Sequence, residues 1–376
     1  MKDNKKQIKV LHVMACGDIG GISSVVLNYY RHIDKDKVHF DVALVDSAEG
    51  RDAMVFRSLG SEIYHIPRKR DDKEKYKKEL GKIILDGKYD FIHVHENETS
   101  YVALKVAKDL GIKGRIAHSH TSSNCESIRD NIRRWSGIVL NEKYATKLIA
   151  CGQLAGDRVF GKRNMRTDKA IILPNAIDID MFRYNEMVRN EIRERYSLED
   201  KKVLLFVGRL SPEKNLEFLI DVVVRVYANN PDVMTLIVGS GEEHNNLETL
   251  IKANNAQDYI KLLGARNDVN DLMNASDVLL LPSIHEGFPV VAVEAMASGL
   301  PLFVSDAVTR ELDFYPSIYY LSLKNAEVWE SKIRDVLQDE HKDRISRDCL
   351  MKKHGFDIKD SARILQDIYE KDVDNV

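Results

Sequence analysis

The segment 277–306 constrains the fold of this chain most strongly, because strand, loop, helix and strand signals follow one another in it without a gap. Residues 278–281 form a continuous apolar run, which is typical of a short strand buried on both faces. Pro289 suits the first turn of a helix, and the apolar residues after it predict a helix that ends at Gly299. Pro301 forbids its extension, and residues 302–304 predict a second strand. The segment therefore predicts one unit of a parallel α/β sheet.

Two carboxylates stand out in this segment. Glu286 follows the first strand, at the edge where open α/β sheets bind their ligands, and Glu294 lies among core-type residues of the helix. Gly287 lets a ligand approach the backbone, and the free N–H groups after Phe288 attract an anion. A nucleotide sugar, with hydroxyls and phosphates, matches all of these groups. Taken singly, each glutamate has an ordinary alternative as a solvent-facing acid.

The composition is that of a globular protein with room for two domains. The chain has 376 residues, 44% hydrophobic and 31% charged, and its formal net charge of −3 gives no general attraction to nucleic acid. Four dispersed cysteines fit a reduced, cytoplasmic protein without a metal motif. No signal-peptide core follows the N-terminus and no apolar run reaches membrane-spanning length, so we expect any membrane contact to be peripheral.

Strand and helix signals alternate twice along the chain. The first alternation runs to the break at residues 174–178, and the second begins at Lys202. We therefore expect two Rossmann-like, doubly wound α/β domains, residues 1–180 and residues 181–356. A C-terminal helix near 357–376 is expected to pack back on the first domain.

Three features of the first half invite a functional interpretation. The turn that contains Gly20 and Gly21 opens a helix as a phosphate-binding turn does, although a plain tight turn explains it equally well. His118 and His120 end a strand, where either a functional or a structural histidine fits. The helix at 128–144 joins arginines to Trp135, which suits an anionic membrane surface, but a solvent-exposed surface helix remains the simpler alternative.

Several loops of the second half should meet at one edge of the sheet. Arg209 and Lys214 lie five residues apart between a strand and a helix, which suits a diphosphate. The glycines Gly239 and Gly241, and then Arg266, follow later strands. Two cations together with the Glu286 and Glu294 pair predict a site for an anionic, hydroxyl-rich ligand.

These motifs resemble those of the group 1 family of retaining nucleotide-sugar glycosyltransferases with the GT-B fold, and especially its bacterial capsular and exopolysaccharide members. The resemblance rests on two glutamates separated by seven residues at Glu286 and Glu294, and on further motifs in the same order: residues 208–215, 238–241, 263–266 and 297–301. Gly20-Gly21, residues 118–121 and residues 174–178 fit more loosely, and Ala176 stands where the family often has glycine.

The resemblance implies that the two domains face each other across a cleft, with residues 1–180 on the acceptor side and residues 181–356 on the donor side. It also implies a role for each matching residue. Glu286, His120, Arg209 and Lys214 would be catalytic: Glu286 near the anomeric centre, His120 positioning the sugar or the attacking hydroxyl, and the two cations neutralising the leaving diphosphate. Glu294 would hold the ribose hydroxyls. The remaining donor-binding residues implied by the resemblance are Gly20, Gly21, Gly239, Gly241, Arg266, Gly287, Phe288 and Pro289.

The implied reaction is transfer of a hexose or amino-hexose from a nucleoside diphosphate sugar, with UDP preferred, to a glycan or lipid-linked acceptor in polysaccharide biosynthesis. No cofactor is expected, and no metal, because Asp178-Ile-Asp180 and Asp372-Val-Asp374 lie away from the site. The alternatives are a nucleotide-sugar 2-epimerase or hydrolase on the same fold, and a non-catalytic nucleotide-sugar-binding subunit. A dehydrogenase is disfavoured by the weak glycine fingerprint.

Overall fold

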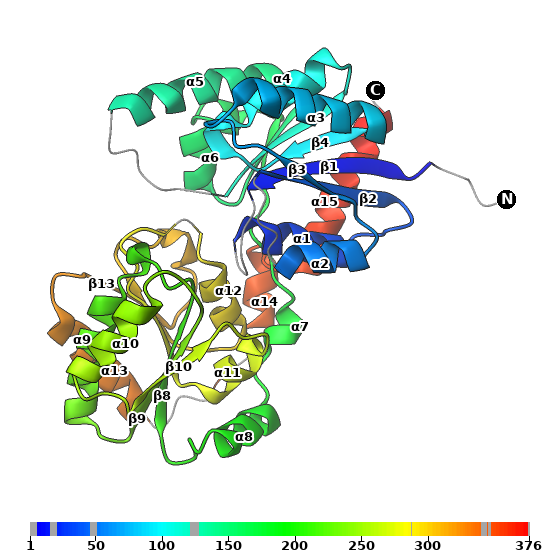
Figure 1. The fold of residues 1–376 in the computed structure, drawn as a ribbon. Coiled ribbons are helices and arrows are strands. Elements are labelled where there is room, and N and C mark those ends of the chain that lie inside the picture. Colours follow the sequence, from blue (N-terminus) through cyan, green and yellow to red (C-terminus); the bar gives the residue numbers. More distant parts are fainter. Residues whose placement is uncertain are drawn as a thin grey trace. The chain divides into compact units, whose positions relative to one another are not determined.

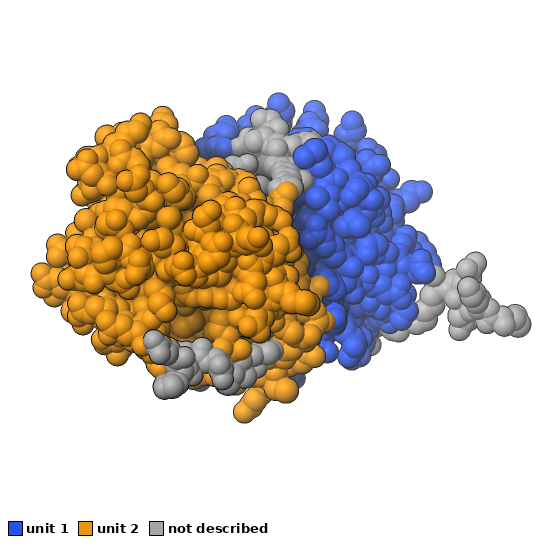
Figure 2. Space-filling model, turned by 90° about the horizontal axis from the view of Figure 1, so that it is seen from below, with its two compact units in different colours: residues 1–176, 355–376 blue, residues 177–354 orange. Residues whose placement is uncertain are grey.

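The computed structural model describes residues 6–15, 21–45, 51–120, 128–286, 288–339, 344 and 347–374. The chain divides into two compact units, Met1–Ala176 with Gly355–Val376, and Ile177–His354 (Figure 2). The chain passes between the units a few residues before the boundaries that we expected at 180 and 356.

The first unit is built on a seven-stranded parallel sheet in the order β3-β2-β1-β4-β5-β6-β7 (Figure 1). Its strands are β1 (Ile8–Ala15), β2 (Val38–Val45), β3 (Ile63–Ile66), β4 (Phe91–Val94), β5 (Gly114–Ser119), β6 (Lys147–Ala150) and β7 (Ala170–Ile172). Its helices are α1 (Ile22–His32), α2 (Arg51–Ser58), α3 (Lys73–Gly87), α4 (Tyr101–Asp109), α5 (Ile128–Tyr144), α6 (Gln153–Val159) and α15 (Ile358–Asp374), with short 3-10 helices at Asn97–Thr99 and Asn164–Arg166.

The two faces of this sheet differ in chemistry. Side chains alternate along a strand, so Leu11 and Val13 of β1 point to one face, where they join the apolar core with Leu80 of α3 and Leu104 of α4. The opposite face carries His12 between them, and α15 packs beside α1. Tyr369 of α15 is fully buried there. The C-terminal helix therefore completes the first unit, although it follows the second unit in the sequence.

The second unit repeats the plan with a six-stranded parallel sheet in the order β10-β9-β8-β11-β12-β13. Its strands are β8 (Lys202–Val207), β9 (Val233–Val238), β10 (Ile260–Gly264), β11 (Val278–Leu281), β12 (Leu302–Ser305) and β13 (Ile318–Leu321). Its helices are α7 (Ile179–Phe182), α8 (Glu186–Arg195), α9 (Leu216–Asn229), α10 (His244–Ala253), α11 (Val269–Ala275), α12 (Val290–Ala297), α13 (Ala326–Gln338) and α14 (Asp348–Lys353), with 3-10 helices at Pro212–Lys214 and Arg310–Leu312. Phe206, Leu280 and Phe303 pack with Leu219 of α9 and Trp329 of α13 into its core.

The doubly wound α/β class is confirmed in both units, and the differences from prediction concern short elements. The sequence did not predict α6 or α8. Helix α8 buries only Ile192 and Arg193, so its pattern has too few apolar residues to be recognised. Pro289 precedes α12 as its N-cap instead of opening its first turn. In the described part of the chain, we find no helix with the length and apolarity needed to span a membrane.

Candidate active site

The loops at the carboxyl edge of the second sheet are joined by main-chain hydrogen bonds. The loop after β8 is tied to the loop after β9, because the amide of Gly208 donates to Val238 O (3.0 Å) and that of Leu210 to Ser240 O (2.9 Å). Gly239 donates in turn to Gly264 O after β10 (2.9 Å), and Ile284 after β11 donates to Glu213 O (2.8 Å). Loops from four neighbouring strands therefore form one continuous, ordered rim.

Gly239 and Gly241 are required by the closeness of these loops. A Cβ at Gly239 would lie 1.8 Å from the carbonyl oxygen of Gly208, and one at Gly241 would lie 2.2 Å from that of Leu210. Gly239 also has a φ of 148°. Glycine, which has no Cβ, therefore allows the loop after β9 to approach the backbone of the loop after β8 this closely.

Lys214 and Glu286 meet on this rim. Lys214 Nζ lies 2.5 Å from Glu286 Oε2, and the side chains are 16% and 13% exposed. Ser283 Oγ donates to the same carboxylate oxygen at 2.9 Å. The carbonyl of Ser283 accepts a bond from Ser305 Oγ at 2.5 Å, which anchors this loop to the end of β12. The Glu286 carboxylate is therefore fixed by a cation and a hydroxyl, and it retains a second oxygen for other contacts.

The other two predicted cations differ in their surroundings. Arg209 is exposed in the loop that carries Lys214. Arg266 holds Asp268 through two parallel bonds, Nε to Oδ1 at 2.9 Å and Nη2 to Oδ2 at 2.6 Å. Arg266 is thus partly neutralised by Asp268, as Lys214 is by Glu286.

Glu294 lies on α12, the helix that follows the Glu286 loop in the sequence. It is half-buried, and desolvation by burial raises the pKa of its carboxyl group to about 7. No other described residue forms a hydrogen bond with its carboxylate. Phe288 and Pro289 are buried at the start of α12, which has no side-chain cap. Gly287 lies outside the described residues. An uncapped helix start and a poorly solvated carboxylate are suited to a ligand with phosphates and hydroxyls.

The first unit brings five histidines together on the face of the sheet covered by α15. They are nearly fully buried, with exposed fractions of 1% for His12 and His93, 2% for His95 and His118, and 9% for His120. Gly21 caps α1 with a φ of 89°, and Gly20 lies outside the described residues. His120 follows β5 instead of belonging to it, and the strand that holds His93 ends before His95.

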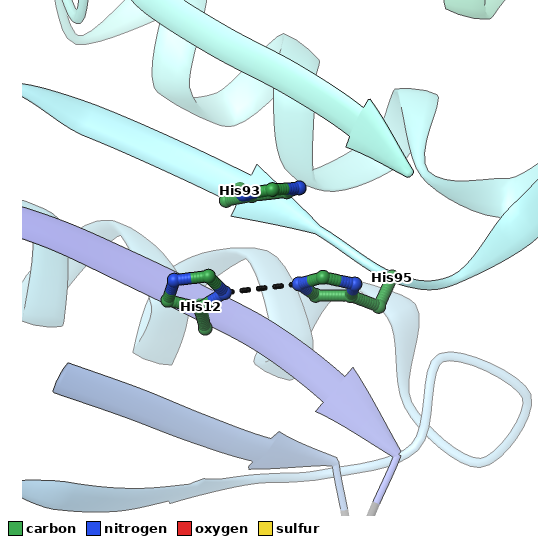
Figure 3. Close-up of side chains that lie close together, drawn as sticks. All are labelled: His12, His93 and His95. Atoms are coloured by element: carbon green, nitrogen blue, oxygen red, sulfur yellow. Dashed lines mark hydrogen bonds between the residues drawn. The ribbon is translucent and has the colours of Figure 1, made fainter. Parts of the chain in front are cut away.

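The histidines are linked by hydrogen bonds between ring nitrogens. His12 Nδ1 lies 2.9 Å from His95 Nε2, and His95 Nδ1 lies 2.8 Å from His120 Nε2 (the first contact is drawn in Figure 3). His120 Nδ1 lies 3.1 Å from Asn175 Oδ1. A second pair, His93 Nε2 and His118 Nδ1 at 3.2 Å, is held by the Tyr369 hydroxyl, 2.7 Å from His93 Nδ1.

Sequence reasoning assigned no role to His12, His93, His95, Asn175 or Tyr369. The sequence does contain a pattern for the histidines. His93 and His95, like His118 and His120, stand two residues apart near a strand end, so the side chains of each pair point to one face of the sheet. Tyr369 could not be found this way, because its partner is 276 residues away in the sequence.

The two Asp-x-Asp segments belong to helices. Asp178 caps the first turn of α7 by accepting from the amides of Asp180 and Met181, and Asp180 is paired with Arg183 at 2.7 Å. Asp372 and Asp374 belong to α15, but their side chains lie outside the described part.

Comparison with known proteins extends the match to both units. Residues 188–348 match the family of glycosyl transferases group 1, and residues 19–181 match glycosyltransferase family 4. The chain is 30% identical over 316 residues to the glycosyltransferase EpsF of Bacillus subtilis, with 82% of each chain covered. It is 25% identical to the UDP-Gal:alpha-D-GlcNAc-diphosphoundecaprenol alpha-1,3-galactosyltransferase of Escherichia coli, with 98% of each chain covered.

Solved structures have the same fold. The Anabaena protein Alr3699/HepE in complex with UDP has a TM-score of 0.79 and 19% identity, with coverage of 97% of this chain and 100% of that one. The lipopolysaccharide glycosyltransferase WaaG has a TM-score of 0.66 and 16% identity, with coverage of 96% and 95%. Their two-domain α/β fold is GT-B. From its motifs, its fold and its relatives, the chain belongs to the group 1 glycosyltransferases.

Proposed function

We propose that this protein transfers a hexose or amino-hexose from a UDP-sugar to a glycan or lipid-linked acceptor in bacterial surface polysaccharide synthesis, with retention of the anomeric configuration and at the cytoplasmic face of the membrane. The observation that carries this proposal is the Lys214–Glu286 pair at 2.5 Å on the carboxyl edge of the second sheet. It joins a phosphate-binding cation to a carboxylate close to the uncapped start of α12.

The proposed reaction is the one that the resemblance to retaining glycosyltransferases implies, with these roles for the groups on this rim. The acceptor hydroxyl oxygen forms a bond to the anomeric carbon while the bond from that carbon to the diphosphate breaks on the same face of the sugar. The hydroxyl proton passes to the departing phosphate. Lys214 and Arg209 stabilise the negative charge that grows on the diphosphate, and Glu286 orients the sugar beside the breaking bond. Glu294 accepts hydrogen bonds from the ribose hydroxyls.

The names of the relatives support the class of donor and acceptor. The Escherichia coli relative is named for UDP-Gal as donor and for a GlcNAc-diphosphoundecaprenol acceptor. The Anabaena protein has been solved with UDP and with UDP-glucose. We infer from these names a uridine nucleotide donor and an acceptor of the diphosphate-linked lipid class.

The proposal is tested by incubating the protein with a panel of nucleoside diphosphate sugars, with and without lipid-linked acceptors. We expect nucleoside diphosphate release that depends on acceptor, together with incorporation of the sugar into the lipid fraction. Conversion of the nucleotide sugar to its 2-epimer or to free sugar without acceptor would instead identify an epimerase or hydrolase. Nucleotide binding without turnover on any donor would identify a binding subunit.

The raised pKa of Glu294, about 7, predicts that nucleoside binding depends on pH. The ionised carboxylate can accept hydrogen bonds from both ribose hydroxyls, whereas the protonated form has lost part of that capacity. Affinity for uridine should therefore rise roughly tenfold between about pH 6 and about pH 8, as the carboxyl group ionises. Isothermal titration at a series of pH values measures this, and uridine is chosen because it has no phosphate that titrates in this range.

Glu294→Gln is the control for this prediction. The amide removes the titrating group while its size is nearly unchanged, so binding to the variant should be weaker and independent of pH. A pH dependence that persists in Glu294→Gln would assign the effect to another group and remove Glu294 from the ribose site.

Helix α5 supports the proposed contact with a membrane surface. Ile132, Trp135 and Val139 are 66%, 69% and 51% exposed and lie on one side of the helix, where they line a shallow apolar hollow. Arg133 is next to them, with 60% of its side chain exposed. An apolar face with a tryptophan and an adjacent arginine suits the interface of a bilayer with anionic headgroups.

Sedimentation with lipid vesicles tests this contact. We expect binding to vesicles that contain anionic phospholipid, weakened about fivefold by Arg133→Ala, since one basic residue near such a surface contributes about 1 kcal/mol. Trp135→Ser should weaken it further. Met187→Ser removes an exposed apolar side chain, 78% exposed, from α8 and serves as the matched control. Equal binding by all variants would exclude α5 as the contact.

A further inference from the structure

The buried histidines of the first unit form a hydrogen-bonded chain whose direction can be deduced. The chain runs from Asn175 through His120 and His95 to His12. His120 and His95 directly follow β5 and β4, and His12 lies within β1; the three strands are neighbours in the sheet, and the rings of His95 and His12 face each other in Figure 3. Each ring nitrogen in the chain, except the last, faces one acceptor or donor.

The direction is set at the Asn175 end. With the Asn175 amide oriented so that Oδ1, a carbonyl oxygen that can only accept, faces His120, the His120 proton is placed on Nδ1. His120 Nε2 is then a lone pair and accepts from His95 Nδ1–H. His95 Nε2 likewise accepts from His12 Nδ1–H. All three rings are therefore the same neutral tautomer, with the proton on Nδ1.

The far end of the chain agrees with this assignment. His12 Nε2 is buried and has no hydrogen-bond partner among the described residues. In the opposite direction this nitrogen would carry a buried N–H without an acceptor. A lone pair there costs less free energy, because buried acceptors without a partner are tolerated better than buried donors without one. The rings also remain neutral, since burial lowers the pKa of His12 to about 3 and of His120 to about 4, and the pKa of His95 lies well below its ordinary value.

The charged and hydroxyl groups near the chain do not change the neutral state of its three rings. Asp41, the carboxylate that acts on His12, is already bonded to the His39 ring at 2.9 Å and to the Tyr89 hydroxyl at 2.9 Å. Tyr369, which covers the same face from α15, is bonded to His93 in the second histidine pair. Neither group provides an acceptor that would hold a second proton on the chain.

We propose that Asn175 and His95 are positioning residues that lock His120 in one neutral tautomer and one ring orientation, and that His12 extends the chain by holding the His95 ring. His120 then has both ring nitrogens occupied, by Asn175 and His95. With neither ring nitrogen free, it acts at the acceptor side as a fixed neutral ring whose face or carbon edge contacts the sugar or the attacking hydroxyl, and it does not carry a proton in the reaction. This role rests on the proposed function, but the tautomer itself can be measured without any activity.

The same ring nitrogens are close enough together to bind a metal ion. Their hydrogen bonds to one another favour a hydrogen-bonded chain over a metal site. Two sets of three, His12 with His93 and His95, and His95 with His118 and His120, have ligand nitrogens within 4.8 Å of one another. The pairs at 2.8 and 2.9 Å use these nitrogens to bond one another. A metal with Zn–N distances of about 2.0–2.1 Å would have to break these bonds.

NMR of the full-length protein labelled with 15N-histidine tests the chain. Two-bond 1H–15N correlations identify which ring nitrogen carries the proton, and each ring is assigned by its own substitution. At neutral pH we expect His12, His95 and His120 to be protonated on Nδ1, with no change on adding a chelator or Zn2+. An Nε2–H or imidazolium signal from any of the three overturns the proposal, as does a spectrum that responds to chelator or Zn2+.

Three variants separate the anchor from the rest of the chain. Asn175→Asp can only accept, so His120 and His95 should keep their Nδ1 protons. Asn175→Leu removes the anchor, so His120 should show a mixture of tautomers. His12→Leu breaks the far end only, and His120 should stay protonated on Nδ1. If His120 in Asn175→Leu still shows only the Nδ1–H tautomer, Asn175 does not set the direction of the hydrogen-bonded chain. Thermal unfolding shows whether each variant is folded.

The effect of the chain on catalysis is measured separately, from kcat and from nucleotide affinity. Asn175→Leu should lower kcat on the order of tenfold to a hundredfold through loss of orientation, with nucleotide affinity little changed, because the residues proposed to hold the diphosphate and the ribose, Arg209, Lys214 and Glu294, lie in the second unit. A loss of stability without this split between kcat and affinity would reduce Asn175 to a purely structural role. Correct tautomers in a protein that transfers no sugar would leave the chain intact and contradict the proposed function instead.

Discussion

Replacing Lys214 with alanine is expected to reduce kcat by about 10²–10³-fold, the usual loss when one electrostatic donor to a transition state is removed. The cation neutralises a diphosphate whose charge grows as the sugar leaves, so turnover should fall more than donor affinity. The substitution also leaves Glu286, which is 13% exposed and bonded to Lys214 Nζ at 2.5 Å, without its cation. Steady-state kinetics with the best donor of the panel, together with titration of the nucleoside diphosphate, measures both quantities.

The chain contains a matched control for this charge. Lys201 precedes β8, as Lys214 follows it, and pairs with Asp232 at 3.7 Å at the opposite end of the strand. Lys201→Ala removes the same charge and should leave kcat within twofold or so of the parent, since exposed ion pairs contribute about 0–1 kcal/mol. Near-normal turnover of Lys214→Ala would refute the diphosphate assignment.

The contact also predicts that Lys214 and Glu286 act as a unit. Glu286→Gln alone should lower turnover with little change in nucleotide affinity. The double variant Lys214→Ala, Glu286→Gln should lose less than the product of the two single losses, because each single change already disrupts the shared contact. Fully additive losses would indicate that the pair seen in the structure is not maintained during the reaction.

Replacing Gly239 with alanine is expected to destabilise the second unit by roughly 3 kcal/mol or more, through backbone overlap and a strained φ. The added Cβ would lie 1.8 Å from Gly208 O, and a backbone oxygen cannot turn away as a side chain can. The corresponding drop in the unfolding midpoint is roughly 6–12 °C for a domain of this size. Differential scanning calorimetry measures it, with a fall in donor affinity as a second readout because the loop supports the rim.

Gly264→Ala separates the overlap from the effect of backbone conformation. Gly264 has a φ of 66°, but a Cβ there meets nothing within 4 Å. Its cost should therefore be only about 1–2 kcal/mol, that of placing a side chain in the left-handed region. Equal losses at Gly239 and Gly264 would show that the close approach to Gly208 does not decide the identity of residue 239.

The sequence predicted the strands of both sheets because most of them are short, largely apolar runs between glycine, proline or charged residues. Residues 278–281 are the clearest example, since β11 has these bounds and is buried throughout. Helices with a sparse apolar face were missed, as α8 illustrates. The return of the C-terminal helix to the first unit was expected, but its place beside α1 could not be derived, because no local pattern reports which helix a terminal helix packs against.

The candidate site was predictable where its residues share one loop or one strand end. Arg209 and Lys214, and the two glutamates, could be assigned to a common edge from spacing and the rule for parallel sheets. The direct bond between Lys214 and Glu286 was not predictable, because it depends on how two loops separated by 72 positions meet. The histidine chain could not be predicted for the same reason: its members lie in or directly after three strands and in the segment that contains Asn175, and only the sheet order makes them neighbours.

The stereochemistry of transfer is the most direct test of the account. The product is followed by proton NMR at its anomeric position, in a reaction run with excess chelator. We predict the anomeric configuration of the donor in the product and turnover unaffected by the chelator, because Arg209, Lys214 and the start of α12 supply the positive charge that a metal would supply. An inverted product would contradict the retaining mechanism, and loss of turnover restored by Mg2+ or Mn2+ would contradict the metal-free neutralisation of the diphosphate.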